Sequence, residues 1–509
     1  MTKKTSAFLL AFLMLFSIVS CGKAGGDKPE DVTVPETTDS PVTTQSELAD
    51  FIDSFVPPAT TAETATCDGW GIPVYDFDGY EFKFLNADQV FSMYTYIIPD
   101  VDGDVLNEAC VLRDILAWEK FDIKMTEETK PYDQLASYAQ TLIQTGEHVY
   151  DAMYIGCRDL TPLISENLFA DLLTVSELRV DMIWWDQATI NRNIIEDRLF
   201  YATSDLNLMT IESTYAMFFN EDMMKGLGLD FPYQLVMDGY WTQEKLNEYA
   251  KEAANLNGDN SFEYEAERKA TYGEVAVPGF ERYRLYGFDT EYVTRKNYYG
   301  VYEFTAHTDE LFGDAWSKII DYCGSGDGRV LYCDESEYLR TFADGRALFL
   351  SAPLKEARIL NHYEKPFGIL PQPKYAEDQQ NYEATFDENV LAFCIPSTNP
   401  NLRRTGVIVD YLTYESYRSI IPKYYDICVS RKALTAEESR RSLEIIRNVK
   451  GIEVSVPYGW ASDLSDALCA QARTGNLEIA PTIETYQEAC IEAIKKTYEV
   501  YPTQSKAGR

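Results

Sequence analysis

The chain has 509 residues, of which 45% are hydrophobic, so it is long enough and apolar enough to form two folded cores. Its formal net charge at pH 7 is -37, with 82 acidic residues against 45 basic ones. Binding to nucleic acid requires clustered Lys and Arg, and this balance excludes nucleic acid as the expected partner. No Gly-x-Ser-x-Gly, His-Glu-x-x-His or Gly-x-x-x-x-Gly-Lys motif occurs, which removes the commonest signatures of nucleophilic, zinc and phosphate sites.

The N-terminus has the pattern of an export signal. Lys3 and Lys4 precede an apolar run from Ala7 to Val19, which is shorter than the roughly 20 residues that a membrane-spanning helix needs. The run leads into Ile18-Val19-Ser20-Cys21-Gly22, which resembles a bacterial lipobox. This resemblance implies a signal peptide over 1–20, a lipid anchor on Cys21 and a location on the outer face of the cell membrane. Two acyl chains hold a protein stably on a bilayer. An ordinary secretory signal with a chance cysteine is the alternative.

Residues 21–67 are predicted to form a disordered tether that begins at the lipidated cysteine. The segment is rich in Thr, Pro and acidic residues and has few apolar side chains. Such a composition cannot bury enough apolar surface to offset the entropy of ordering. As a flexible coil, 45 residues span about 35–40 Å on average.

Strands and helices alternate after residue 75. Strands are predicted at 81–85, 122–126 and 150–155, with helices over 104–121 and 132–145 between them. This order predicts parallel β-α-β units, whose ligands lie beyond the carboxyl ends of the strands. The loops 86–88 and 156–158 are therefore expected to face one crevice.

The same kinds of element are expected along the remainder of the chain. Strands are predicted at 199–201, 215–220, 347–350, 367–371 and 390–396, and helices at 242–253, 311–323, 338–344, 401–414, 437–447, 460–474 and 482–500. Residues 255–285 are polar and are expected to form a surface excursion. The nine cysteines other than Cys21 are scattered without a metal-binding spacing and are expected to be buried thiols, with a Cys323–Cys333 bridge as the alternative.

A series of short motifs, in their order along the chain, resembles the family 1 extracellular solute-binding proteins, the capture subunits of ABC importers. The resemblance extends over nearly all of residues 75–500 and is weakest over 255–285 and 290–305. The motifs that carry it are Phe121-Asp122-Ile123, Gly146-Glu147, Trp184-Trp185-Asp186-Gln187, Phe218-Phe219-Asn220-Glu221-Asp222, Tyr240-Trp241-Thr242, Phe342-Ala343-Asp344-Gly345-Arg346-Ala347 and Ile395-Pro396-Ser397.

This resemblance implies an α/β, two-lobed type II periplasmic-binding-protein fold with an interlobe ligand cleft and a hinge. Lobe 1 is expected over 68–208 plus 352–414, lobe 2 over 209–351 plus 415–502, and a C-terminal tail over 503–509. The chain is expected to cross between the lobes near Leu206–Thr210, Ser351–Pro353 and Tyr414–Glu415. Proteins of this fold close around their ligand by a hinge motion.

A sugar offers C–H faces and hydroxyls, so its site needs aromatic surfaces together with carboxylates, amides or guanidinium groups. Trp460 lies where relatives often carry a ligand-stacking aromatic residue, at the start of a late helix. The other candidates follow strand ends or the expected crossings. They are Arg158, Trp185, Asp186, Asp205, Asn207, Asp387 and Asn389.

Each candidate also has an ordinary structural interpretation. Trp460 could fill the core, and Asp205 and Asn207 could cap a helix or close a turn. Arg158 could form a surface salt bridge, and Asp387 with Asn389 could form a polar turn. Trp184 and Trp185 are adjacent, so their side chains are expected to point apart and only one of them to reach a ligand.

We expect the chain to be a non-enzymatic receptor that captures a carbohydrate, in particular an oligosaccharide, for ABC-transporter uptake. Its expected partners are this ligand, the transmembrane permease subunits and the membrane that holds its lipid anchor. It is expected to be monomeric and to need neither cofactor nor metal. Two alternatives stay open at this point. One is the same fold binding peptides or another solute, and the other is a surface-anchored glycan hydrolase with two carboxylates flanking its cleft.

Overall fold

The computed structural model describes residues 70–71, 75–88, 96–99, 103–265, 267–295, 301–429, 436–501 of the chain. The chain divides into two units, Met1–Ala65 and Thr66–Arg509, and all described residues belong to the second unit. Cys21, the expected signal peptide, the whole of the expected tether at 21–67 and the expected C-terminal tail at 503–509 lie outside the described residues. Within the described part of the chain, no helix has both the length and the apolar character needed to cross a membrane.

The first sheet has the strand order β12-β3-β1-β2. Strands β1 (Tyr80–Ala87), β2 (Ile123–Lys130) and β3 (Ala152–Gly156) are parallel, and β12 (Leu391–Cys394) is antiparallel to β3. Helices α3 (Val105–Phe121) and α4 (Tyr132–Gln144) connect the parallel strands. Asp104 accepts hydrogen bonds from the backbone N–H groups of Leu106 and Asn107 and so begins α3. The predicted β-α-β units at the start of the fold are confirmed.

A long segment after β3 packs on the β12 side of this sheet. It contains η1 (Cys157–Asp159), α5 (Leu160–Ser165), η2 (Leu172–Thr174) and α6 (Gln187–Asn193). Isolated bridges join Phe169 to Pro396 and Ala202 to Phe393, which ties the segment to β12. Helix α15 (Leu402–Glu415) packs against α3.

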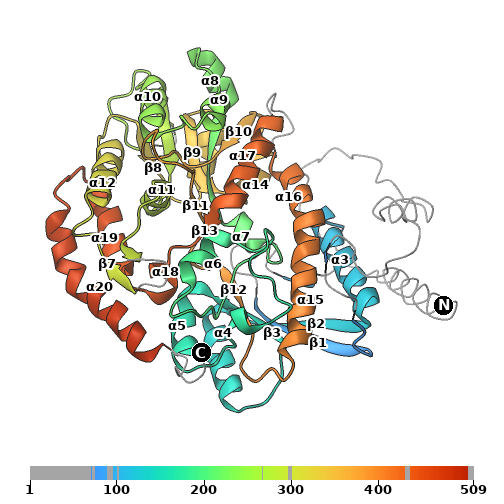
Figure 1. The fold of residues 1–509 in the computed structure, drawn as a ribbon. Coiled ribbons are helices and arrows are strands. Elements are labelled where there is room, and N and C mark those ends of the chain that lie inside the picture. The colour runs from blue at the N-terminus through green and yellow to red at the C-terminus, as the bar shows by residue number, and fades with distance from the viewer. Residues whose placement is uncertain are drawn as a thin grey trace, which may run out of the picture. The chain divides into compact units, whose positions relative to one another are not determined.

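The second sheet has the order β10-β4-β9-β5-β8. Its strands are β4 (Tyr215–Asn220), β5 (Tyr272–Ala276), β8 (Val330–Tyr332), β9 (Ala347–Pro353) and β10 (Phe367–Leu370). Strand β5 is parallel to β8 and β9, whereas β4 is antiparallel to β9 and β10. The two sheets lie in different parts of the folded unit, upper and lower in Figure 1.

Short helices surround the second sheet. They are α8 (Glu221–Leu227), α9 (Tyr233–Met237), α10 (Gln243–Ala253), α12 (Glu310–Cys323), α13 (Tyr338–Ala343) and α14 (Glu356–Leu360). Asn220 caps α8 and Thr242 caps α10, each by accepting a backbone N–H hydrogen bond.

The prediction that the chain crosses between the lobes at Ser351–Pro353 is wrong. Residues 351–353 are the end of β9, and the chain then remains with the second sheet, because β10 forms a hydrogen-bonded ladder with β4. It returns to the first sheet only at β12. Residues 352–370 therefore belong with the second sheet and not with the expected lobe 1.

Three short stretches lie between the two sheets. Helix α7 (Met209–Glu212) leads into β4, and Thr214 forms a bridge with Phe386. Strand β11 (Ala384–Thr385) pairs in parallel with β13 (Lys450–Gly451). The chain passes from α15 to α16 (Ile421–Cys428) through one π-helical turn, Ser416–Ile420. Single π-helical turns are frequently found at functional sites.

The C-terminal helices contact both halves of the fold. Helix α17 (Ala436–Val449) packs on β10, α18 (Ser455–Tyr458) contacts η1 and α5, and α19 (Ser462–Ala472) contacts α12. Helix α20 (Ala480–Val500) contacts α5, α19 and β7. Helix α11 (Glu281–Gly287) precedes a hairpin of β6 (Val293–Arg295) and β7 (Tyr302–Phe304).

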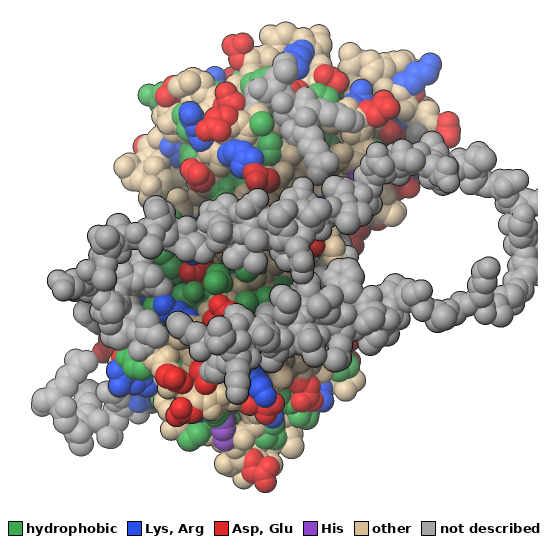
Figure 2. Space-filling view, turned by 90° about the vertical axis from the view of Figure 1, so that its right-hand side faces the viewer, with side chains coloured by type: hydrophobic (Ala, Val, Ile, Leu, Met, Phe, Trp, Pro, Cys, Tyr) green, Lys and Arg blue, Asp and Glu red, His purple; other side chains and the backbone are tan. Residues whose placement is uncertain are grey.

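Every cysteine that the structure describes is buried and reduced, so Cys323 and Cys333 form no bridge. This agrees with the expectation of buried thiols. Acidic and basic side chains are interspersed on the described parts of the face seen in Figure 2.

Candidate functional site

The carboxyl end of β3 forms one wall of the candidate site. Gly156 ends this strand, and a β-carbon there would collide with the hydroxyl of Tyr132, so glycine permits the close approach of α4. Arg158 follows directly in η1, and its Nη1 lies 3.0 Å from Oε1 of Glu388. Oε2 of Glu388 lies 3.6 Å from Nη1 of Arg282 in α11. Glu388 therefore links the two halves of the fold through one carboxylate.

Asp387 and Asn389 flank this glutamate and also reach the site. Asp387 Oδ1 accepts hydrogen bonds from the backbone N–H (2.9 Å) and the Nδ2 amide (2.8 Å) of Asn389, which is the polar turn considered as the alternative. Its other oxygen accepts a hydrogen bond of 3.1 Å from the hydroxyl of Tyr283. The ring of Tyr283 stacks on Tyr215 with a centroid distance of 3.5 Å. The structure thus brings Arg158, Asp387 and Asn389 together.

A cavity of about 50 Å³ lies beside this group, between α11, the chain after β11 and the segment from β13 to α19; we call it the cleft cavity. Its wall is mostly aromatic and hydroxyl-bearing. The residues that line it are Arg282, Tyr283, Leu285, Tyr286, Thr290, Tyr292, Thr385, Phe386, Glu388, Ile452, Glu453, Ser455, Val456, Ala461, Ser462 and Ser465. Tyr286 is buried, and its hydroxyl has no hydrogen-bond partner among the described residues. A wall of this composition suits a small polar molecule with apolar faces.

Acidic groups collect behind the wall around Arg192 at the end of α6. Its Nε lies 2.6 Å from Glu291, and its Nη2 lies 3.2 Å from Glu383 and 3.6 Å from Asp289. Burial raises the pKa of Glu383 to about 7, although Arg192 opposes the shift. Burial, reinforced by the charge of Glu291, raises the pKa of Glu453 to about 8. This side of the cleft cavity therefore holds more carboxyl groups than bases.

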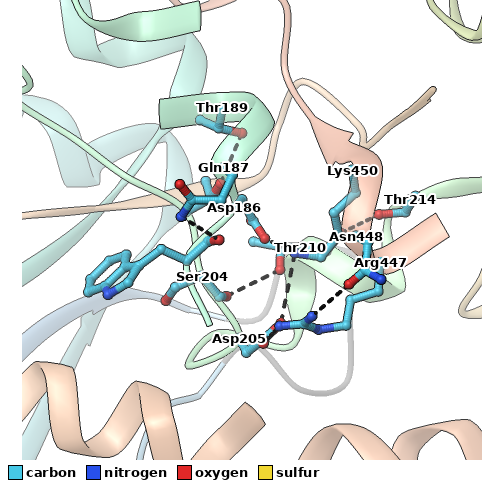
Figure 3. A network of polar contacts seen from close by, with 12 residues as sticks. Asp186, Gln187, Thr189, Ser204, Asp205, Thr210, Thr214, Arg447, Asn448 and Lys450 are labelled. Atoms are coloured by element: carbon cyan, nitrogen blue, oxygen red, sulfur yellow. Dashed lines mark hydrogen bonds and ion pairs between the residues drawn. The ribbon is translucent and has the colours of Figure 1, made fainter. Parts of the chain in front are cut away.

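Asp186 and Asp205 do not face a cleft, contrary to expectation. Both are buried, where Asp186 binds Lys450 and Asp205 binds Arg447 (Figure 3). Lys450 Nζ also lies 3.9 Å from Asp205 Oδ1. Burial raises the pKa of Asp205, although Arg447 and Lys450 oppose the shift. We call these four residues the ion-pair cluster. A buried carboxylate requires a partner, and here the partners are Arg447 of α17 and Lys450 of β13. The cluster therefore joins the chain around α6 to these two elements.

Asn207 is also buried, and it closes the turn before α7. Its Oδ1 accepts a 3.0 Å hydrogen bond from the backbone N–H of Met209. The turn interpretation therefore describes Asn207 better than the cleft interpretation.

Trp185 is a core residue. Its indole N–H points to Oδ1 of Asp410 at 3.4 Å, and that of Trp184 reaches the same oxygen at 3.1 Å. The two indole N–H groups thus converge on one carboxylate, and the expectation that adjacent tryptophans point apart is wrong. A turn leads into this pair, because the backbone N–H of Trp185 donates a 3.0 Å hydrogen bond to the carbonyl of Met182.

Trp460 is 2% exposed and lies in an aromatic cluster. Tyr458 stacks on it at a centroid distance of 5.1 Å, and Tyr302 of β7 lies 5.7 Å away. Its indole N–H donates a 2.8 Å hydrogen bond to Thr497 of α20. The hairpin that supplies Tyr302 belongs to the region 290–305, where the resemblance is weakest. Tyr302 of the hairpin covers the indole ring of Trp460, so Trp460 packs in the core of the described structure.

The sequence interpretation missed most of the cavity wall. Arg282 and Tyr283 of α11 lie at the end of the segment expected to be a surface excursion, Tyr286 and Tyr292 follow that segment, and Glu453 follows β13. Three tyrosines within ten residues, at 283, 286 and 292, were the available signal, since aromatic side chains are frequent in the walls of ligand pockets.

Solved structures with the same fold were found, although neither a protein-family model nor a curated protein sequence matches the chain. A cyclo/maltodextrin-binding protein in complex with maltotetraose has a TM-score of 0.55 at 8% identity, covering 83% of this chain and 98% of its own. The cyclic α-maltosyl-1,6-maltose binding protein from Arthrobacter globiformis has a TM-score of 0.53 at 11% identity, covering 82% and 99%. UgpB from Mycobacterium tuberculosis, in complex with glycerophosphocholine, has a TM-score of 0.52 at 13% identity, covering 82% and 99%.

These likenesses establish the fold. The chain has the two-lobed α/β architecture of these solved structures, with the two sheets described above as its two halves.

Proposed function

We propose that the protein is a solute-binding protein that captures a carbohydrate in the cleft cavity and delivers it unchanged to the permease of an ABC importer. The fold supports this class. Two structural neighbours are named for the maltose-type oligosaccharides that they bind. The observation that carries the proposal is the cavity itself, because its wall combines tyrosine rings with hydroxyls and carboxylates.

The size of the cleft cavity bears on how an oligosaccharide would bind. A volume of about 50 Å³ corresponds to about three to five water molecules. In this conformation, the cavity accommodates no more than one sugar ring. The other units of an oligosaccharide would lie outside its mouth, near Arg158 and Glu388.

The proposal includes anchoring of the receptor as a monomer to the outer face of the cell membrane. It rests on Lys3, Lys4, the apolar run and the lipobox-like residues up to Cys21. Two acyl chains on one cysteine suffice for stable anchoring. Metabolic labelling with a radioactive fatty acid tests this part, and a Cys21→Ser variant should lose the label.

A thermal-shift screen of the intact protein against oligosaccharides, peptides and amino acids tests the main proposal. A ligand at 100 times its Kd should stabilise the folded state by about 2.7 kcal/mol. We expect a carbohydrate to give this shift and to be recovered unchanged. A shift with peptides alone would overturn the ligand class, and a shortened glycan would favour a hydrolase.

Two matched variants locate the site in the same screen. Ser465→Leu fills the cleft cavity from α19 and should abolish the shift. Ser137→Leu makes the same change on the exposed face of α4 and should leave it intact. An unchanged shift in Ser465→Leu would place the ligand elsewhere.

A further inference from the structure

The charged residues that line the cleft cavity are Arg282, Glu388 and Glu453. The guanidinium of Arg282 is already engaged, because its Nη2 lies 2.6 Å from Asp466 and its Nη1 lies 3.6 Å from Glu388. Glu388 is further bound to Arg158. The positive charge on the wall is therefore balanced by acids that belong to the protein.

Glu453 differs from Glu388 in having no bound cation. It is 8% exposed and accepts a 3.0 Å hydrogen bond from the backbone N–H of Tyr292. Within the described residues, no Lys or Arg forms an ion pair with it. The base whose charge acts on it is Arg192, which already forms ion pairs with three carboxylates. A buried carboxyl without a cation is costly to ionise.

The hydroxyl of Tyr286 is a second group in the wall that the protein does not fully satisfy. The hydroxyl of Tyr286, which is 6% exposed, has no hydrogen bond among the described residues. Both Glu453 and Tyr286 line the cavity, and the charge of Glu453 acts on the Tyr286 phenol. Buried polar groups are nearly always hydrogen-bonded, so an unpaired hydroxyl in a cavity wall indicates a group that a ligand would satisfy.

On the basis of the proposed function, we propose that the cleft cavity recognises a protonated amino group. The captured carbohydrate is then an amino sugar with a free ammonium. An ammonium group has three donors and no acceptor, and the wall offers it the carboxylate of Glu453 and the oxygen of Tyr286. A neutral sugar would leave Glu453 protonated and would form no ion pair with it. An acidic sugar would meet the negative charge of Glu388 on the same wall.

Proton release is a consequence of this assignment. Burial and Glu291 hold the pKa of Glu453 at about 8, so it carries a proton at pH 7 when the cavity is empty. The charged and titratable groups that act on it are Glu291, Arg192, Tyr286 and Tyr292. An ammonium beside Glu453 favours its ionised form, so the proton leaves as the ligand binds.

Titration calorimetry of the intact protein at pH 7 tests the inference. The probes are glucose and galactose, their 2-amino counterparts glucosamine and galactosamine, and N-acetylglucosamine. We expect one amino sugar to bind at least tenfold more tightly than its neutral and N-acetylated forms. Its heat of binding should differ between phosphate and Tris buffers, because a proton is released to the buffer.

The variant Glu453→Gln keeps the shape of the side chain and removes its charge. We expect it to lose both the tenfold preference and the buffer dependence. The control Glu488→Gln makes the same change on the exposed face of α20 and should keep both. Retention of the preference in Glu453→Gln would overturn the assignment to this residue.

The outcomes separate this inference from the proposed function. An amino sugar that binds no better than its neutral counterpart, or does not bind while another carbohydrate does, overturns the inference and leaves the receptor function standing. Failure of every carbohydrate in the thermal-shift screen overturns both.

Discussion

The ion-pair cluster and the cleft cavity both hold buried charges between the two sheets, but they balance those charges differently. The ion-pair cluster contains two acids, Asp186 and Asp205, and two bases, Arg447 and Lys450. The wall of the cleft cavity carries Glu388 and Glu453 with Arg282 as its base, and Glu453 has no ion pair among the described residues.

This difference separates structural charges from charges that are available to a ligand. Sequence position alone did not separate the two kinds of charge, because Asp205 and Asp387 both lie near places where the chain passes between the two halves of the fold. Whether a buried carboxylate has a basic partner decides whether it serves the fold or a ligand. A carboxylate that is bound to Arg447 serves the fold, whereas one that faces a cavity without a base can serve a ligand.

Breaking the ion-pair cluster should have the largest effect on stability. The variant Lys450→Met leaves Asp186 buried without its cation, and we expect a loss of about 3–5 kcal/mol in the free energy of unfolding. Urea denaturation measures it. The control Lys495→Met lies on the exposed surface of α20 and should change stability by less than about 0.5 kcal/mol. A cost below about 1 kcal/mol for Lys450→Met would show that the cluster is not a structural requirement.

The pH dependence of stability should distinguish Glu453 from the paired acids. Its pKa is raised from 4.5 to about 8 by burial, so between these values the folded state holds a proton that the unfolded state has released. Stability must then fall as pH rises through this range. Glu453→Gln removes this loss, so at pH 8 it should gain on the order of a few kcal/mol over the parent chain, with no gain at pH 4.

Denaturation curves at several pH values measure this difference. Glu488→Gln serves as the control and should follow the parent chain throughout. Parallel pH profiles of the parent chain and Glu453→Gln would contradict the description of Glu453 as a buried carboxyl without a counter-charge.

The smallest change in stability is expected at the mouth of the cleft cavity. The side chain of Arg158 is 50% exposed, so its ion pair with Glu388 is screened by water and is worth about 0–1 kcal/mol. The variant Arg158→Met should therefore unfold nearly as the parent chain does, yet bind the captured carbohydrate more weakly. Unfolding curves and titration calorimetry together check this. A large loss of stability with unchanged affinity would assign Arg158 to the fold.

Local sequence patterns predicted much of the fold correctly. Alternating residues at 81–85 and apolar runs at 150–155 and 215–220 predicted β1, β3 and β4, and the helices predicted at 104–121 and 242–253 correspond to α3 and α10. The second crossing was misplaced because Phe367–Leu370 reads equally well as a strand of either sheet. Only the long-range pairing with β4 assigns it.

The candidate site was predictable only in part, for the same reason. Arg158, Asp387 and Asn389 follow or precede strands at the sheet edge, and topology alone brings them together. Trp460 was expected to stack on a ligand, but its surroundings include Tyr302 from a hairpin that has no counterpart in the motifs that carry the resemblance. No local pattern shows that a distant hairpin covers a ring.

The affinity of Tyr286→Phe for the captured carbohydrate tests the central claim, that the cleft cavity is the ligand site, most directly. Removal of an unpaired buried hydroxyl should leave the free energy of unfolding unchanged or raise it by about 1 kcal/mol. The account predicts that Kd nevertheless rises about tenfold or more, a loss of about 1.4 kcal/mol in binding, while the exposed control Tyr240→Phe binds as the parent chain does. An unchanged Kd in Tyr286→Phe, with its fold intact, would contradict the account and move the ligand to another part of the molecule.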